Sequence, residues 1–151
     1  MSQKKVGFLL NAALAVTLAL LFLVPLQSFA YEKNVFVTKW QGSKGAKPGE
    51  KGKIVFPLDV KDAEWRFYKM STTPPSTWQA KKTFYVGKIG EESLKGALTL
   101  ETDENAVYVL EIKGNITRIA LGLKGKPFGS VENLLEIVQW GSSTFTYLNS
   151  A

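Results

Sequence analysis

Short apolar runs, broken at close intervals, constrain the fold of this chain more than any other feature. After residue 30, runs of β-branched, aromatic and aliphatic residues alternate with glycine, asparagine, aspartate and lysine. Such runs are typical of β-strands, because branched and aromatic side chains fit a pleated surface. They leave no room for the crossover helices of a parallel sheet, so the sequence predicts an all-β, antiparallel sandwich. We expect strands over residues 34–40, 53–60, 64–69, 83–86, 97–101, 107–112 and 116–121.

Proline and glycine mark the interruptions. Pro57 places its run at a sheet edge or a bulge, because proline donates no backbone hydrogen bond. Residues 41–52 contain four glycines and a proline and predict a loop. Residues 71–78, STTPPSTW, predict a rigid turn. The candidate helix is Ser130–Val138 with Ser130 as its N-cap, although strand-forming residues end it.

Residues 1–30 have the composition of an export signal. Two lysines precede a largely apolar run from Val6 to Val24, and a proline and several small residues follow it. We therefore expect an N-terminal signal helix with cleavage between Ala30 and Tyr31. The alternative is an uncleaved membrane anchor, since about 20 apolar residues suffice to cross a bilayer.

Cleavage would leave residues 31–151, enough for one domain with its own core. That domain has 17 basic and 13 acidic residues, a net charge of +4, because Lys4 and Lys5 leave with the signal. The excess favours anionic surfaces, but it lacks the clustering that nucleic-acid binding requires. We expect no nucleic-acid partner, and membrane contact only through an uncleaved signal segment.

The chain contains neither histidine nor cysteine, which excludes disulfides and the usual general base, zinc ligands and thiolate nucleophile. Glycoside hydrolysis needs two facing carboxyl groups, and calcium needs a pattern such as D-x-D-x-D-G, which does not occur. We therefore expect no enzyme, no metal site and no cofactor. The remaining acidic residues are interpreted as turn residues: Glu91, Glu92, Asp103, Glu104, Asp59 and Asp62.

Large aromatic residues have to fill the interior of a domain without disulfides. On this ground we expect Trp40, Trp65 and Trp140 in the core. Trp78 follows a Pro-Pro turn and is the candidate ligand contact, for a sugar ring, with burial as the equal alternative. The loop from Lys39 to Lys53 carries five lysines and one acid. We expect a solvated, mobile loop there, with contact to anionic polysaccharide or lipid as the alternative.

Three motifs carry a resemblance to a known family. The first strand reads F-x-T-x-W, a later one reads YVLEIKG, and the C-terminal part contains LLEIVQW. With these motifs the chain resembles the N-terminal part of BspA-like leucine-rich-repeat surface proteins of anaerobic bacteria. The sequence departs from the family at Trp65, where relatives have W-G-D-G and this chain has W-R-F-Y. The matching residues are Phe36, Thr38, Trp40, Tyr108, Leu110, Ile112, Gly114, Leu134, Ile137 and Trp140.

The resemblance implies an immunoglobulin- or PKD-like β-sandwich over residues 31–129. Residues 130–151 would start a leucine-rich-repeat segment, and the alternative is that they form the last strands of the sandwich. Because one repeat cannot bury its own apolar ridge, we expect the chain to be a fragment of a longer repeat protein.

The resemblance further implies a non-enzymatic cell-surface or secreted protein that acts in adhesion. Its partner would be a host or bacterial surface protein or a glycan. The competing hypothesis is a self-contained, small periplasmic binding or inhibitor-like β-domain.

Overall fold

A computed structural model describes residues 30–86, 96–120, 122–123, 126–127, 129–142 and 147–149. The chain divides into two compact units, Met1–Ala30 and Tyr31–Ala151. The expected signal helix lies outside the described residues, and the account below concerns the second unit. Within the described ranges, no helix has the length and apolarity needed to span a bilayer.

The described part of the chain is built from strands, with a single short 3-10 helix, η1 (Val131–Asn133). The expected all-β, antiparallel architecture is therefore confirmed at this level. The strands are β1 (Phe36–Gln41), β2 (Gly52–Val55), β3 (Leu58–Lys69), β4 (Gln79–Phe84), β5 (Thr99–Thr102), β6 (Val107–Ala120), β7 (Gly122–Leu123), β8 (Lys126–Pro127), β9 (Leu134–Gln139) and β10 (Tyr147–Asn149).

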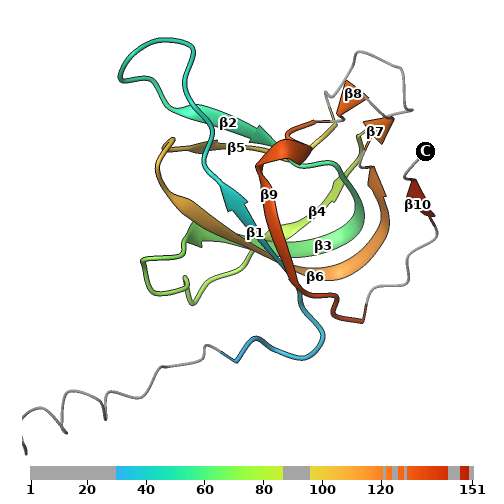
Figure 1. Cartoon of the computed structure of the whole chain (residues 1–151). Helices are drawn as coiled ribbons and strands as arrows, with labels where there is room; N and C mark the ends of the chain where they lie inside the picture. Colours follow the sequence, from blue (N-terminus) through green and yellow to red (C-terminus); the bar gives the residue numbers. More distant parts are fainter. Residues whose placement is uncertain are drawn as a thin grey trace, which may run out of the picture. The chain divides into compact units, whose positions relative to one another are not determined.

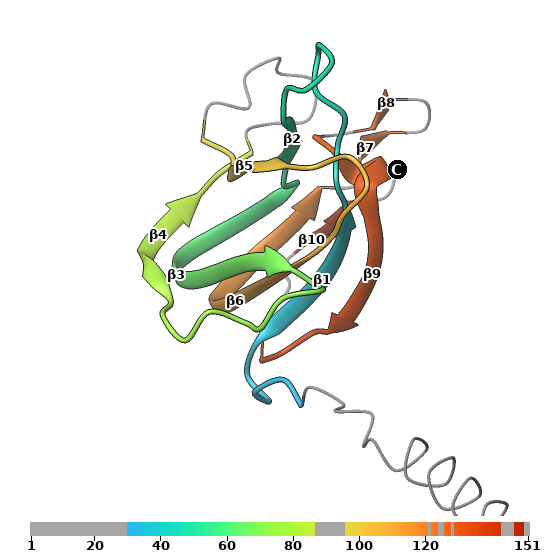
Figure 2. The same ribbon diagram turned by 90° about the vertical axis from the view of Figure 1, so that its left-hand side faces the viewer.

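Most strands form one curved sheet, here called the main sheet, in the order β4-β3-β6-β1-β9 (Figure 1). Its neighbours are antiparallel, and β10 adds to the end of β6 in the parallel direction. Strands β2 and β5 form a separate antiparallel pair, here called the ribbon, and β7 pairs with β8. Figure 2 shows β3 and β6 running side by side along the main sheet.

The chain changes sheets at Pro57. Residues 53–60, expected as one run, divide into β2 of the ribbon and β3 of the main sheet. Pro57 lacks an N–H group, but its carbonyl accepts a hydrogen bond from the Ala120 N–H at 2.8 Å. The proline therefore lies between two strands of different sheets and not, as predicted, at an edge or bulge of one continuous run.

Two expected strand breaks are bulges within longer strands. Strand β3 continues through Asp62, which has a φ of 47° and whose N–H binds the Thr83 hydroxyl. Strand β6 continues through Gly114, with a φ of 153°. A Cβ at Gly114 would lie 2.5 Å from the Cβ of Ala63, so only glycine lets β3 and β6 approach there.

The expected helix over Ser130–Val138 is wrong beyond η1. Leu134–Gln139 forms the edge strand β9, because its side chains pack against β1 and the main core rather than against a helical turn. Ser130 does not cap η1 with its side chain. Instead its hydroxyl accepts a hydrogen bond from the Val55 N–H at 3.0 Å, which ties this segment to β2.

The main core lies between the main sheet and the ribbon. Trp40 is buried there, edge-on to Phe56 at 4.7 Å, as expected. Trp65 is half-buried against the same cluster. The expectation for Trp140 is wrong, because its side chain is 45% exposed just after β9, where its ring lies 6.0 Å from that of Phe36.

A substitution at Ile54 tests whether the ribbon packs against the main sheet, because the Ile54 side chain is fully buried in the main core. We expect Ile54→Ala to lower the free energy of unfolding by about 2–5 kcal/mol, through lost burial and the cavity left behind. Urea unfolding measures the change. The control is Lys53→Ala on the exposed side of the same strand, which should change stability by about 0.5 kcal/mol or less. Equal effects of the two variants would contradict this packing.

Candidate functional site

The face of the main sheet opposite the main core, here called the outer face, carries a second cluster. Side chains alternate along a strand, so Trp65 and Phe67 enter the main core while Arg66 and Tyr68 face outward. The members of the outer cluster are Val35, Val37, Tyr68 and Val109, with Tyr31, Trp78 and Val138 packed against them. Tyr31, Trp78 and Val138 therefore shield part of the outer face from solvent.

Glu111 lies at the centre of the outer face and is fully buried. The β-ladder places it opposite Arg66 on β3 and Val37 on β1. Its carboxylate accepts a hydrogen bond from Arg66 Nη2 at 2.8 Å and another from the Tyr68 hydroxyl at 2.5 Å. A buried carboxylate is tolerated only with such partners, since removing it from water is costly.

The same contact affects Tyr68. Burial, and then the hydrogen bond to the Glu111 carboxylate, raise the pKa of the Tyr68 phenol above its ordinary value. The phenol therefore stays protonated at neutral pH and keeps its proton on the shared bond. Tyr68, Glu111 and Arg66 form one connected polar group within the outer cluster.

Arg66 extends this group to the Pro-Pro turn. Its Nη1 donates to the Pro75 carbonyl at 2.9 Å, and its guanidinium lies 4.5 Å from the ring centroid of Trp78. Lys113 Nζ also lies over the Trp78 ring, at 4.0 Å. Two cations therefore hold Trp78 on the outer face, through attraction to its π-electrons.

Trp78, the candidate ligand contact, is half-buried rather than fully exposed or fully enclosed. Its indole N–H makes no hydrogen bond to any residue that the structure describes. The ring face is shared with Arg66 and Lys113, so a sugar could stack on it only where the flexible Lys113 side chain moves away. The indole nitrogen is not among the buried, unpartnered polar atoms of the described residues, so its N–H is accessible.

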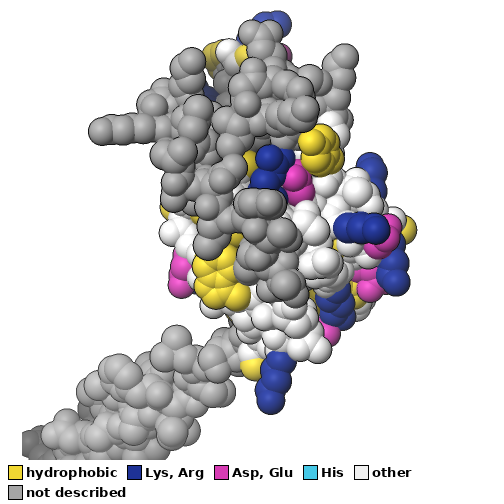
Figure 3. Space-filling view, turned by 90° about the vertical axis from the view of Figure 1, so that its right-hand side faces the viewer, with side chains coloured by type: hydrophobic (Ala, Val, Ile, Leu, Met, Phe, Trp, Pro, Cys, Tyr) yellow, Lys and Arg dark blue, Asp and Glu magenta, His cyan; other side chains and the backbone are white. Residues whose placement is uncertain are grey.

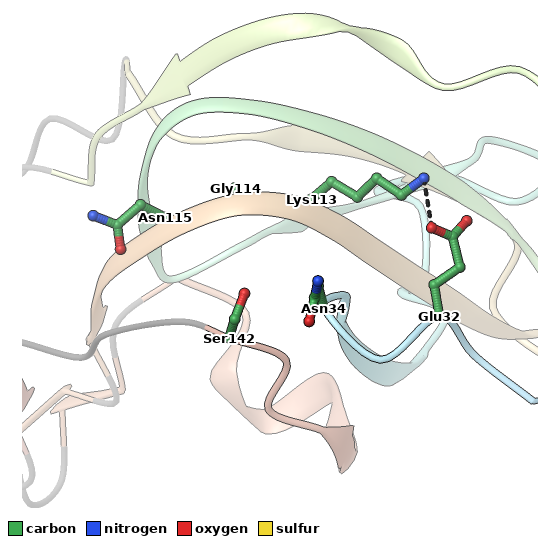
Figure 4. Close-up of a pocket in the computed structure, with 6 residues that line it drawn as sticks. All are labelled: Glu32, Asn34, Lys113, Gly114, Asn115 and Ser142. Atoms are coloured by element: carbon green, nitrogen blue, oxygen red, sulfur yellow. Dashed lines mark ion pairs between the residues drawn. The ribbon is translucent and has the colours of Figure 1, made fainter.

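Lys113, which lies over the Trp78 ring, also lines a polar hollow of about 500 Å³, shown in Figure 4. Its sides come from the N-terminal segment, from β6 and from the turn after β9. Asn34, Asn115 and Ser142 have no hydrogen-bonding partner among the described residues for their side chains. At one end Glu32 and Lys113 form an ion pair at 2.8 Å. The hollow therefore offers uncharged donors and acceptors beside a neutralised charge pair.

The N-terminal segment that supplies one wall is anchored. Gln139 Nε2 donates to the carbonyls of Glu32, at 2.6 Å, and Val35, at 2.8 Å. Tyr31 packs against the outer cluster, and burial raises the pKa of its phenol. Ala30 is exposed directly before it. The two residues at the expected cleavage site thus lie at the border of the packed domain.

The structure places four of the six acidic residues interpreted as turn residues. Asp103 and Glu104 lie in the β5–β6 connection as expected, and hydrogen bonding to Lys69 lowers the pKa of Asp103. The turn interpretation is wrong for Asp59, which lies buried inside β3 and binds Arg118 and the Val86 N–H. Within the described ranges, no group of three acidic residues could hold a metal. Glu91 and Glu92 lie outside those ranges.

Most of the lysine side chains of the Lys39–Lys53 loop are exposed, while its glycines allow close backbone contacts. A Cβ at Gly42 would lie 1.9 Å from the Asp103 carbonyl oxygen, and one at Gly52 would lie 1.9 Å from that of Ser43. Lys39 lies in β1 and Lys53 in β2, and Lys39 pairs with Glu136 at 2.8 Å. Contact of this loop with anionic polymers stays a prediction.

Basic and acidic side chains are interleaved on the face that Figure 3 shows. In the view of Figure 3, the basic and acidic side chains drawn in colour lie beside one another, and hydrophobic side chains form separate patches. Such a surface differs from the single-sign patch that polyanions bind.

Sequence reasoning missed Glu111 and the three uncharged side chains of the polar hollow. Glu111 interrupts the apolar run VYVLEI at an outward-facing position, and that interruption is the available signal for a buried ion pair. Asn34, Asn115 and Ser142 come from distant parts of the chain, so no local pattern indicates them.

A scan against protein-family models finds no match, and searches of curated proteins and of solved structures find no similar protein.

We expect Glu111→Gln to lower the free energy of unfolding by about 3–5 kcal/mol, because Arg66 would lose its buried counter-charge. The control is Glu136→Gln, which breaks the more exposed pair with Lys39 and should cost about 1 kcal/mol or less. Urea unfolding of both variants at neutral pH provides the comparison. A loss for Glu111→Gln as small as that of the control would contradict the role given to the buried pair.

Proposed function

We propose that the chain is the binding domain of an exported, non-enzymatic bacterial surface or secreted protein, and that it contacts a glycan at the outer face. The observation that carries this proposal is the polar hollow beside Trp78. The hollow holds three uncharged side chains without partners among the described residues, and it is linked to Trp78 through Lys113, which lines the hollow and whose Nζ lies 4.0 Å from the centroid of the indole ring.

The chemistry of this region fits a carbohydrate. Amide side chains such as those of Asn34 and Asn115 both donate and accept hydrogen bonds, as the hydroxyl groups of a sugar do. The ion pair of Glu32 and Lys113 leaves no net charge at the hollow, which favours a neutral ligand over an anion. Trp78, whose ring lies 4.0 Å from Lys113 Nζ, adds an indole N–H without a partner among the described residues.

Binding without catalysis is supported by the residues present. The sequence has no histidine or cysteine, and hydrolysis of a glycan would need two carboxyl groups facing each other across the ligand. Glu32 is the one carboxylate among the described residues of the hollow, and Lys113 neutralises it.

For the finer fold we propose an immunoglobulin- or PKD-like sandwich of the BspA-like kind, preceded by a signal helix. Two motifs behind this proposal are neighbours in the main sheet, where Thr38 of β1 pairs with Leu110 of β6. The Thr38 hydroxyl accepts a hydrogen bond from the Trp40 indole at 2.8 Å, which gives the F-x-T-x-W spacing a structural reason. Adhesion and continuation into leucine-rich repeats belong to the same proposal.

Export predicts a defined mature N-terminus. When the full chain is expressed in an exporting bacterium, mass spectrometry of the product should give a chain that begins at Tyr31. The variant Ala30→Arg should retain the leader, because a bulky charged residue blocks the position that signal peptidase reads. A wild-type product that keeps Met1 and sediments with membranes would favour the anchor instead.

Glycan binding predicts a local mutational pattern. On a glycan array, the purified protein should bind neutral oligosaccharides, and Asn34→Ala and Trp78→Ala should each weaken binding about tenfold, the equivalent of one or two lost hydrogen bonds. Asn105→Ala, which removes an exposed amide from the β5–β6 turn, is the control and should bind normally. Absence of binding, or an equal loss in all three variants, would count against this site.

A further inference from the structure

The segment Tyr31–Val35, here called the strap, supplies one wall of the polar hollow. Glu32 and Asn34 of the strap line the hollow, and Glu32 forms the ion pair with Lys113 (Figure 4). Both of these strap residues are exposed, whereas Val35 at the end of the strap is fully buried. The wall therefore depends on how the strap is held against the domain.

The strap precedes β1 and belongs to no strand. It forms a turn, in which the Val35 N–H donates to the Glu32 carbonyl at 3.1 Å. A segment without ladder hydrogen bonds opens at a lower cost than the strands of a sheet do. Side-chain contacts from elsewhere in the domain have to keep the strap in place.

Gln139, the last residue of β9, provides such a contact at two points. In the β-ladder it lies opposite Val37, two residues after the end of the strap. Its Nε2 donates to the Glu32 carbonyl at 2.6 Å and to the Val35 carbonyl at 2.8 Å. One amide group thus uses both of its N–H donors to hold the two ends of the turn.

The turn after β9 adds a close backbone contact to the strap. Gly141 has a φ of 63°, and a Cβ there would lie 2.8 Å from the Val35 carbonyl carbon and 2.9 Å from the Phe36 nitrogen. Glycine alone permits this approach in that conformation. The next residue, Ser142, lines the hollow. Residues 139–142 therefore both hold the strap and supply another wall of the same hollow.

We propose that Gln139 is the positioning residue of the polar hollow, because it keeps the strap docked and a ligand binds only in that state. Gln139 is not among the described residues that line the hollow, so it acts on a ligand through Glu32 and Asn34. Docking and binding then strengthen each other, since a ligand that needs the docked strap also stabilises it. The ligand part of this inference rests on the proposed glycan site, while the docking part is tested without a ligand.

Hydrogen exchange of the Val35 amide, followed by NMR on the isotope-labelled protein, measures strap docking. We expect Gln139→Met to accelerate this exchange about tenfold or more, the equivalent of two lost hydrogen bonds, because it keeps the side-chain length but removes the donors. Gln139→Lys keeps a donor of similar reach and should restore slow exchange.

Gln41→Met is the matched control. The Nε2 of Gln41 also donates to two carbonyls, those of Glu104 at 2.8 Å and Ala106 at 3.5 Å, but these lie in the β5–β6 connection. This variant should leave the Val35 exchange unchanged. Unchanged exchange in Gln139→Met would overturn the proposal, as would equal acceleration in Gln41→Met, which would indicate a general loss of stability.

The ligand arm uses the neutral disaccharides maltose, cellobiose and lactose. One that binds should slow the Val35 exchange about tenfold when it is present at ten times its dissociation constant. Gln139→Met should weaken its binding by no more than the factor by which it accelerates exchange, because affinity falls only with the docked fraction.

A bound disaccharide that leaves the Val35 exchange unchanged would overturn the coupling. A loss of affinity in Gln139→Met larger than the acceleration of exchange would mean that Gln139 touches the ligand, and would overturn its positioning role. Absence of binding by all of these sugars would count against the glycan site, and the Val35 exchange would still decide whether Gln139 holds the strap.

Discussion

The buried ion pair of Glu111 determines how this small domain can cover both faces of its main sheet. One face packs against the ribbon and needs only apolar side chains. The other face has the buried Glu111 carboxylate at its centre, which needs Arg66 and the Tyr68 hydroxyl as partners. Arg66 in turn holds the Pro-Pro turn through the Pro75 carbonyl. Because Arg66 also lies against Trp78, the position of the aromatic ring depends on the same carboxylate. Stability and the shape of the outer face are thus linked through one residue.

The proposed glycan contact has a simple physical cause. The polar hollow collects side chains that the fold does not need for its own hydrogen bonds. They come from the N-terminal segment, from β6 and from the turn after β9, so the hollow forms only when these three segments meet. Their amide and hydroxyl groups are suited to the hydroxyl groups of a sugar.

Local sequence patterns predicted most of the strands and the burial of Trp40, because alternation and β-branching act within a few residues. They placed one strand at residues 83–86, whereas β4 spans Gln79–Phe84, and they missed β9. They failed where a tertiary contact overrides a local signal. Gly114 looks like a strand break, but it lets β3 and β6 pass closely within one continuous strand. Ser130 looks like a helix cap, but its hydroxyl binds β2. Asp59 looks like a turn residue, but Arg118 and the Val86 N–H make its burial favourable.

The sequence by itself determined an all-β, antiparallel chain whose interior is filled by large rings, and it excluded chemistry that needs histidine or cysteine. These properties follow from composition and short-range spacing. Only the tertiary structure decided which acids are buried, which tryptophan stays exposed and which polar side chains meet at one hollow. The reason is that these properties depend on residues tens of positions apart, whose encounter is set by strand order and register.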